Sequence, residues 1–335
     1  MTLSPGTRPA GAPEAGPRGD RQADARVLYI GGSGRSGSTL LERLIGHVRG
    51  FCSVGELVHL WRRGVSRNEL CGCGAAFAEC GFWQEVGTRA FGGWDAVDPR
   101  EILALEAAVN RHRFIPLMMT PREWFSYHRK LASYRDVLQR LYQGIHRAGG
   151  GGVIVDSSKS APYAFVLAGT TGVDLRMLHL VRDSRGVSHS WTRRVLRPEV
   201  VGTKSYMPRY HPGRAAIEWT IDNLLVHLLS SRGTPYHFVR YETMAHRPRQ
   251  SLREILAFAG PWLEGGQDLS FLGPSHAVLG TTHSVAGNPI RFQQGRVPLR
   301  TDERWKERMP VSDRILVSLL TRPLLRRYGY DGSLR

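Results

Sequence analysis

The chain has 335 residues, of which 41% are hydrophobic, and it carries a formal net charge of +17 at pH 7. This length and apolar content exclude a chain too small or too polar to bury a large core, although length alone allows one large domain or two small ones. No stretch approaches 18 uninterrupted apolar residues, so the sequence predicts no membrane-spanning helix.

The N-terminal segment differs in composition from the rest of the chain. Residues 1–25 are rich in Pro, Gly and Ala, and they contain no apolar region of the kind found in signal peptides. We expect a disordered tail there, followed by one domain over residues 26–335 with a helical region at about residues 95–150. The expected location of the protein is cytoplasmic.

A glycine-rich loop follows the first apolar strand. Residues 27–46 read VLYIGGSGRSGSTLLERLIG: a strand, a turn rich in glycine and hydroxyl residues, and a helix, the arrangement that surrounds a phosphate with backbone N–H groups. The spacing of the P-loop pattern G-x4-G-K-[ST] is met by Gly32, Gly37 and Thr39. Ser38 stands where the pattern has lysine, so the loop is predicted to bind a nucleotide without a γ-phosphate. Arg35, inside the loop, could donate a pair of hydrogen bonds to a terminal oxyanion of that ligand. An ordinary glycine-rich turn is the alternative.

Four cysteines follow, Cys52 alone and then Cys71, Cys73 and Cys80 in the segment LCGCGAAFAEC. Three thiols in the pattern C-x-C-x6-C could bind zinc with His59 or Cys52 as a fourth ligand, but this spacing is not a standard zinc-finger pattern. We therefore expect reduced thiols and no metal, with a disulfide between two of them as an alternative.

Residues 100–147 show apolar residues at three- and four-residue spacing, interrupted by prolines, and predict helices. The region contains five aromatic residues that could line a substrate pocket: Phe114, Trp124, Phe125, Tyr127 and Tyr134. Because aromatic stripes on helices usually face the interior, core packing is the expected role for most of them.

Lys159 is one of only four lysines in the chain. It follows the β-branched residues 153–155 and should emerge at the same sheet edge as Arg35. The alternative is that Asp156 and Lys159 cap the next helix.

A second loop of interest lies between an apolar strand at residues 176–181 and the helix after it. Arg182 ends this strand, and Ser190 lies eight residues later on the helix. A guanidinium at a strand end and a hydroxyl two turns along the next helix can meet on one phosphate, with support from the helix N-terminus. With the first loop, this predicts a site for two separate phosphates.

The expected fold class is α/β, a P-loop-like three-layer fold with a central parallel sheet flanked by helices. The predicted strands lie near residues 27–31, 153–155, 176–181 and 236–240, with a fifth after Phe51. The ligand should sit at the carboxyl ends of these strands.

Over residues 27–330 the chain resembles bacterial sulfotransferases that use 3′-phosphoadenosine 5′-phosphosulfate (PAPS) as sulfuryl donor. The family's 5′-phosphosulfate loop is matched by Gly34, Arg35, Ser36, Gly37, Ser38 and Thr39, and its 3′-phosphate pair by Arg182 and Ser190. Residues 238–260 look like its strand ending in Tyr-Glu. Residues 283–309 are similar to its donor-covering loop, in which Arg291, Gly295 and Arg296 would close over the 3′-phosphate.

The resemblance also implies catalytic roles. Glu56 follows a glycine, as does the catalytic glutamate of the protein tyrosine sulfotransferases, and we expect it to be the general base. His59 is the rival, because cytosolic members use a histidine and imidazole has an unperturbed pKa near 6.5, so Glu56 would need burial to compete. Helix capping or pairing with an arginine is the structural alternative for Glu56. Lys159 is assigned to the bridging oxygen of the donor, and Arg35 to charge on the transferring group.

The expected activity is transfer of a sulfuryl group from PAPS to an acceptor hydroxyl by in-line displacement, with no metal required. The acceptor would be a small molecule, a carbohydrate, a lipid or another natural product. A P-loop kinase is disfavoured by Ser38 and by the lack of an evident Mg²⁺-binding aspartate. A basic nucleic-acid-binding protein is disfavoured because the arginines are scattered and no known binding motif occurs.

Overall fold

The computed structural model describes residues 24–119, 125–263 and 266–330. The predicted N-terminal tail covers residues 1–25, of which residues 1–23 lie outside the described residues, as does Trp124. The first strand begins at Ala25, one residue before the expected domain boundary. Within the described ranges, no helix is both long and apolar enough to cross a membrane.

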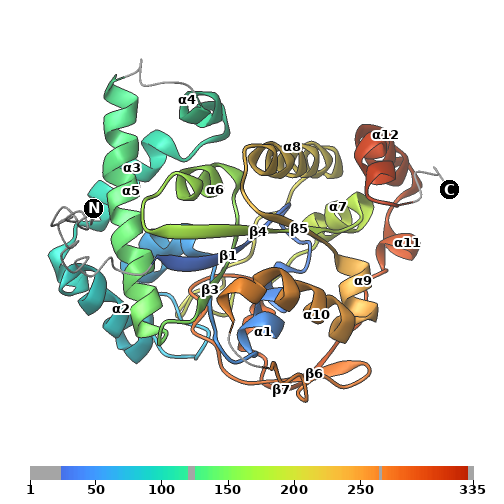
Figure 1. Ribbon diagram of the computed structural model, residues 1–335. Helices are drawn as coiled ribbons and strands as arrows, with labels where there is room; N and C mark the ends of the chain where they lie inside the picture. Colours follow the sequence, from blue (N-terminus) through green and yellow to red (C-terminus); the bar gives the residue numbers. More distant parts are fainter. Residues whose placement is uncertain (1–23, 120–124, 264–265, 331–335) are drawn as a thin grey trace, which may run out of the picture.

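Five parallel strands form the central sheet, as the sequence predicts (Figure 1). They are β1 (Ala25–Gly31), β2 (Phe51–Gly55), β3 (Val153–Lys159), β4 (Val173–Val181) and β5 (Tyr236–Arg240). Their order in space is β2-β3-β1-β4-β5. Most strands are runs of buried apolar residues, which is typical of a parallel sheet covered on both faces. At the carboxyl edge, Gly31 pairs with both Lys159 and His179, so the glycine-rich loop leaves the sheet between β3 and β4.

Helices cover both faces of the sheet (Figure 1). One face is covered by α2 (Gly81–Phe91), α3 (Pro99–Val109), α5 (Phe125–Ala148), α6 (Ala161–Ala168) and α8 (Pro212–Ser231). The other face packs against α1 (Ser38–Gly46) and α10 (Pro248–Ala259). The other α-helices are α4 (Ile115–Met119), α7 (Ser184–Thr192), α9 (Tyr241–His246), α11 (Trp305–Arg308) and α12 (Val311–Arg327). An antiparallel pair of strands, β6 (His276–Leu279) and β7 (Gly295–Pro298), lies outside the central sheet.

The aromatic residues of the helical region pack as expected for a core. Tyr134 is completely buried and Tyr127 nearly so, and both belong to the apolar cluster between α5 and the sheet. Phe114 is partly buried against the same cluster. The core interpretation of these three residues is therefore confirmed.

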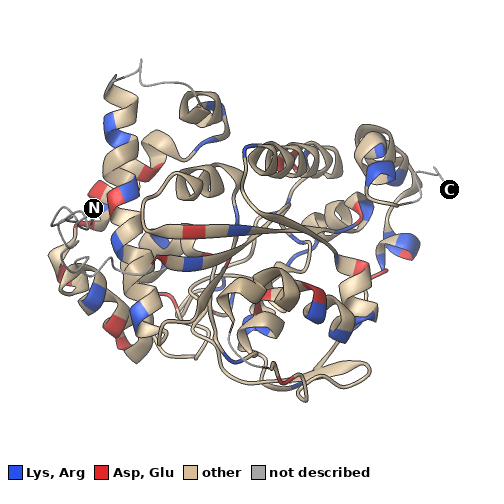
Figure 2. Cartoon of the chain, in the orientation of Figure 1, with Lys and Arg blue, Asp and Glu red and all other residues tan. Residues whose placement is uncertain are grey.

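Charged residues are distributed over the molecule. Lys and Arg residues occur on α5, α10, α11 and α12, with acidic residues among them (Figure 2). This distribution adds no support for a nucleic-acid-binding surface, which usually gathers basic residues on one face.

Candidate active site

The glycine-rich loop joins β1 to α1 in a conformation that requires glycine. Gly37 has a φ of 89°, and a Cβ at this position would lie 2.6 Å from the ring of Tyr241. Arg35 has a φ of 69°, which is uncommon for a residue with a side chain and points to a functional constraint. Because α1 begins at Ser38, the positive end of its dipole faces this loop.

Arg35 carries buried hydrogen-bond donors that the described part of the chain does not satisfy. Its Nε and Nη2 atoms are buried without a partner there, and its guanidinium lies 4.8 Å from the ring centroid of Trp191. Burial lowers the pKa of Arg35 from its ordinary value. The hydroxyls of Ser36 and Ser188 are likewise buried without a partner among the described residues. Since buried donors are costly when unpaired, the neighbouring donors of Arg35 and Ser36 fit a bound anion.

Arg182 lies beside the same loop. Its Nη1 donates to the carbonyl oxygen of Arg35 at 3.1 Å, and its Nη2 donates to the carbonyl oxygen of Asp302 at 2.7 Å. The guanidinium lies 4.8 Å from the ring centroid of Tyr241. Ser190 is half-buried on α7, the helix that begins two residues after Arg182. The structure thus brings Arg182 to the loop, with Ser190 on the adjoining helix.

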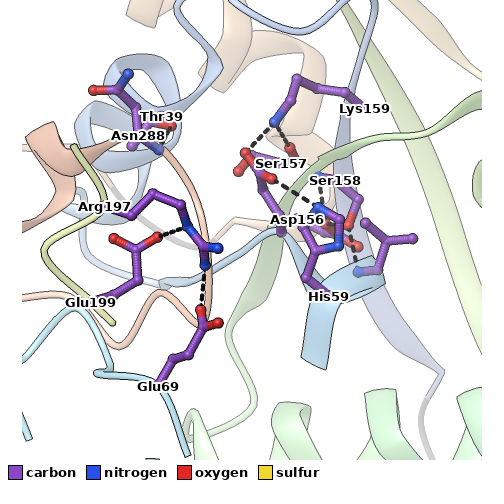
Figure 3. A network of polar contacts seen from close by, with 12 residues as sticks. Thr39, His59, Glu69, Asp156, Ser157, Ser158, Lys159, Arg197, Glu199 and Asn288 are labelled. Carbon is purple, nitrogen blue, oxygen red and sulfur yellow. Dashed lines mark hydrogen bonds and ion pairs between the residues drawn. The ribbon is translucent and has the colours of Figure 1, made fainter. Parts of the chain in front are cut away.

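Glu56, Lys159 and His59 meet at the ends of β2 and β3. Lys159 Nζ donates to Glu56 Oε1 at 2.6 Å and to the carbonyl oxygen of Ser157 at 2.6 Å, and His59 Nε2 lies 3.5 Å from Glu56 Oε2. Figure 3 shows the Lys159 side chain directed into this group, with His59 nearby. Glu56 makes no side-chain cap, and its cationic partner is a lysine, so helix capping and arginine pairing are not its role. Ser160, rather than Asp156 or Lys159, caps the next helix.

The environment of this group changes the basicity of both candidate bases. Burial alone would raise the pKa of Glu56, but Lys159 and His59 together bring it down to about 2. Burial, assisted by Arg63, lowers the pKa of His59 to about 4. Glu56 is therefore a charged carboxylate held by an ammonium, and His59 is neutral at pH 7.

Two buried carboxylates, Glu42 and Asp156, fix the backbone around Glu56. Glu42 accepts hydrogen bonds from the N–H of Gly55 and from three hydroxyls, those of Ser53, Ser157 and Ser284. Asp156 accepts hydrogen bonds from Tyr142 and from the N–H and hydroxyl of Ser158. Ser158 Oγ in turn accepts a hydrogen bond from the N–H of Val58 at 3.0 Å. Glu56 thus lies between two residues, Gly55 and Val58, whose amides are anchored.

The C-terminal segment 284–291 forms a wall of the site. Its Val285 N–H donates to Val54 at 2.9 Å, its Ala286 carbonyl accepts from the N–H of Glu56 at 3.4 Å, and its Asn288 N–H donates to Thr39 Oγ1 at 3.1 Å. Thr39 and Asn288 are adjacent in Figure 3. This segment therefore ties the base region to the start of α1.

Three residues expected to cover the donor lie in or after this segment. Arg291 is buried, and its terminal nitrogens donate to the carbonyl oxygens of Ser284 and, at 2.9 Å, Leu70. This differs from the expected contact with a 3′-phosphate, because those nitrogens are already bonded to the chain. Gly295 and Arg296 are exposed on β7, where Arg296 pairs with Val278.

A buried ion network lies close to the base region. Arg197 donates to Glu69 at 2.6 Å and to Glu199 at 2.9 Å, and Figure 3 shows its guanidinium between the two carboxylates. Glu69 and Glu199 are both buried. The network ties the chain after α7 to the segment that follows Glu56.

A cavity of about 450 Å³ lies next to the Arg182 region. Its lining includes four acidic residues, Asp183, Glu242, Asp302 and Glu303, and four basic ones, Arg185, Arg240, Lys306 and Arg314. This lining has no net positive charge, so it does not favour a ligand with several negative charges.

Sequence reasoning missed Glu42, Trp191 and Asn288. Glu42 occupies what reads as a polar position of an amphipathic helix, yet it is completely buried. Trp191 and Asn288 reach the loop only through the tertiary fold. The one local signal was the small-residue pattern GSGRSGST, which leaves room for large side chains from elsewhere.

The fold and the site define an α/β protein with a glycine-rich loop between β1 and α1 that carries buried, unpartnered donors. The family model of the sulfotransferase domain matches residues 95–269, just over half of the chain. The chain therefore belongs to the sulfotransferase domain family, as its sequence motifs predict. Sulfuryl transfer is the general activity of this family.

Solved structures that resemble most of the chain include two sulfotransferase domains. The sulfotransferase domain of the olefin synthase of Synechococcus PCC 7002 is 21% identical, with a TM-score of 0.53, over 93% of this chain and 97% of that one. The sulfotransferase domain from the curacin biosynthetic pathway is 17% identical, with a TM-score of 0.50, over 92% of this chain and 99% of that one. At these identities the likeness supports the fold. A comparison with curated protein sequences finds no significant match.

Proposed function

We propose that this protein transfers a sulfuryl group from PAPS to the hydroxyl of a small-molecule or natural-product acceptor. The observation that carries the proposal is the set of buried donors in the loop, those of Arg35 and Ser36, which have no acceptor among the described residues. A phosphosulfate offers several oxygen acceptors and negative charge in one group. The expected cytoplasmic location agrees with a donor that is made in the cytosol.

The proposed donor site follows the loop and the end of β4. Residues Gly34 to Thr39 would hold the 5′-phosphosulfate, and Arg182 with Ser190 would hold the 3′-phosphate. Arg182 would then exchange its contact with the Asp302 carbonyl for a charge-assisted hydrogen bond, which is the stronger interaction. Arg291 would act indirectly by holding segment 284–291. Arg296 would contribute positive charge at the rim, where Gly295 lets the backbone of β7 begin with a positive φ.

PAPS supplies the sulfuryl group and a phosphate leaving group when it is bound. Glu56 would take the proton from the acceptor hydroxyl, so that the oxygen can attack in line with the leaving phosphate. Arg35 would stabilise negative charge on the transferring group, and Lys159 would stabilise it on the leaving oxygen. No metal has a part in this scheme.

The Glu56–Lys159 pair suggests how the base is activated. With Lys159 bound, the pKa of Glu56 is about 2, which makes it a poor proton acceptor. If Lys159 turns toward the leaving phosphate, Glu56 loses its main cationic partner while its burial remains. Since burial raises the pKa of Glu56, its basicity then increases. Donor binding would thus prepare the base.

The proposal is tested by incubating the protein with radiolabelled PAPS and a panel of acceptors: a phenol, a sugar, a lipid alcohol and a tyrosine peptide. We expect acceptor-dependent release of adenosine 3′,5′-bisphosphate, and Glu56→Gln should slow it by roughly 10²- to 10⁴-fold, the usual contribution of a general base. The control is Glu254→Gln, at an exposed position on α10. Phosphoryl transfer from ATP with magnesium, without any turnover of PAPS, would contradict the proposal and favour a kinase.

A further inference from the structure

Three cysteines and a histidine form a cluster outside the site described above. Their ligand atoms, the sulfurs of Cys71, Cys73 and Cys80 and a ring nitrogen of His283, all lie within 4.8 Å of one another. Cys71 and Cys80 are buried, and the other two residues are half-buried. The cluster joins the segment before α2 to a residue about 200 positions later in the chain.

Three of the distances inside the cluster are close to the edges of a tetrahedron around a zinc ion. The sulfurs of Cys73 and Cys80 are 3.7 Å apart, and His283 Nδ1 lies 3.3 Å from Cys80 Sγ and 3.9 Å from Cys71 Sγ. With bonds of about 2.3 Å to sulfur and about 2.0 Å to nitrogen, a tetrahedral zinc separates two sulfurs by about 3.8 Å and a sulfur from a nitrogen by about 3.5 Å. A disulfide would instead need about 2.0 Å between sulfurs.

The surroundings of the cluster orient its ligands. The backbone N–H groups of Cys73 and Trp83 donate to the sulfurs of Cys71 and Cys80 respectively. The His283 ring stacks on Phe82, with centroids 5.0 Å apart, and its carbonyl oxygen accepts a hydrogen bond from Trp83 Nε1 at 3.0 Å. Such outer contacts fix ligand orientation in metal sites.

We propose that Cys71, Cys73, Cys80 and His283 bind one Zn²⁺ in a closed, structural site. Three thiolates and one imidazole complete the four-coordinate sphere of a structural zinc and leave no position open for substrate. This revises the sequence-based expectation of no metal, and it also replaces the fourth ligand considered there. His59 lies beside Glu56, and Cys52 packs against Gly149, so neither belongs to the cluster.

The position of the site gives the ion a role in the architecture. The zinc would tie His283 to residues 71–80, next to the hydrogen bond from the Gly72 N–H to the Ser284 carbonyl at 2.9 Å. Segment 284–291 starts at this point and contacts both Glu56 and Thr39. The ion would therefore hold the wall of the active site in place. The zinc proposal rests on the cluster alone and not on the proposed function.

The first test is the metal content of the full chain, purified under reducing conditions without chelator and measured by mass spectrometry. We expect one zinc per chain, retained through gel filtration, and a lower unfolding temperature after removal with a strong chelator. A folded chain with no zinc and four reactive thiols would overturn the proposal, as would a Cys73–Cys80 disulfide in the reduced preparation.

Matched variants identify the ligands. Cys80→Ser and His283→Ala should lose nearly all zinc, whereas Cys52→Ser should keep one equivalent, because Cys52 lies outside the cluster. His283→Cys should restore binding through four thiolates. Equal zinc in Cys80→Ser and Cys52→Ser would overturn the assignment.

Replacement of the metal in the wild-type chain provides a readout that does not depend on variants that fail to fold. Refilling with Co²⁺ alone should give thiolate-to-cobalt charge-transfer absorption together with the visible bands of a tetrahedral ion. A spectrum without thiolate charge transfer would contradict the assigned ligands.

Discussion

In the loop after β1, buried donors of the Arg35 guanidinium and the Ser36 hydroxyl have no acceptor among the described residues. At the ends of β2 and β3, Glu42 and Asp156 accept several hydrogen bonds each, and Glu56 is held by Lys159. The two regions lie on one sheet edge and differ in how completely their polar groups are bonded. The difference suggests that the first region is completed by a ligand, whereas the second is preassembled by the protein.

The largest effect should come from removing the centre of the preassembled region. Glu42→Ala leaves the Gly55 N–H and three hydroxyls without their buried acceptor, so we expect a loss of more than about 3 kcal/mol of unfolding free energy. Urea unfolding measures the change, with Glu254→Ala at an exposed position on α10 as the control. A loss equal to that of the control would mean that this region is not held together by Glu42.

A substitution in the loop around Arg35 should weaken ligand binding without lowering the free energy of unfolding. Arg35→Ala removes a charged hydrogen-bonding group from the proposed PAPS site. A hydrogen bond to a charged group contributes about 1.5–3 kcal/mol, so the variant should bind adenosine 3′,5′-bisphosphate roughly 10- to 100-fold more weakly. The fold should be as stable as wild type or more so, since unpaired buried donors are removed. Arg49→Ala, at an exposed position after α1, is the control. Destabilisation without a change in affinity would remove Arg35 from the donor site.

The Glu56–Lys159 pair predicts a pH-dependent difference in stability. The folded-state pKa of Glu56, about 2, lies below the ordinary value for glutamate, so the pair stabilises the fold above about pH 4.5 and this contribution is lost as the pH falls toward 2. In Lys159→Met, burial dominates and the pKa of Glu56 should rise. Unfolding free energy should therefore increase less between pH 3 and pH 6 in this variant than in wild type. Lys130→Met, at an exposed position on α5, is the control, and identical slopes in all three proteins would refute the pairing.

The smallest effect on ligand binding is expected for Arg296, at the rim of the proposed PAPS site. Arg296 is exposed, and a single exposed charge contributes about 0.2–1 kcal/mol, so Arg296→Ala should weaken binding of adenosine 3′,5′-bisphosphate by no more than about fivefold. The dissociation constant should rise further with salt in wild type than in the variant. A loss as large as that for Arg35→Ala would mean that β7 closes directly over the ligand.

Local sequence patterns were sufficient to predict the sheet and much of its edge. The strands are apolar runs bounded by glycine, and parallel strands bring their carboxyl ends together, which is why Glu56 and Lys159 were expected near Arg35 and do meet each other. The family motifs led to the sulfotransferase assignment, which the family comparison confirms.

Contacts between distant segments were not predictable in the same way. His283 meets three cysteines some 200 residues earlier, and neither segment alone indicates the other. Arg291 reads as a basic loop residue, but its guanidinium is buried against backbone carbonyls. The role of Glu42 could not be predicted, because helical periodicity does not distinguish a solvated carboxylate from a buried one that accepts four hydrogen bonds.

The most direct test of the central claim is a calorimetric titration of adenosine 3′,5′-bisphosphate into the wild-type chain, compared with ATP and magnesium. We predict a dissociation constant near 1 μM, about −8.2 kcal/mol, and much weaker binding of ATP with magnesium. Absence of binding by a folded protein, or tighter binding of ATP with magnesium, would contradict a PAPS site at this edge of the sheet.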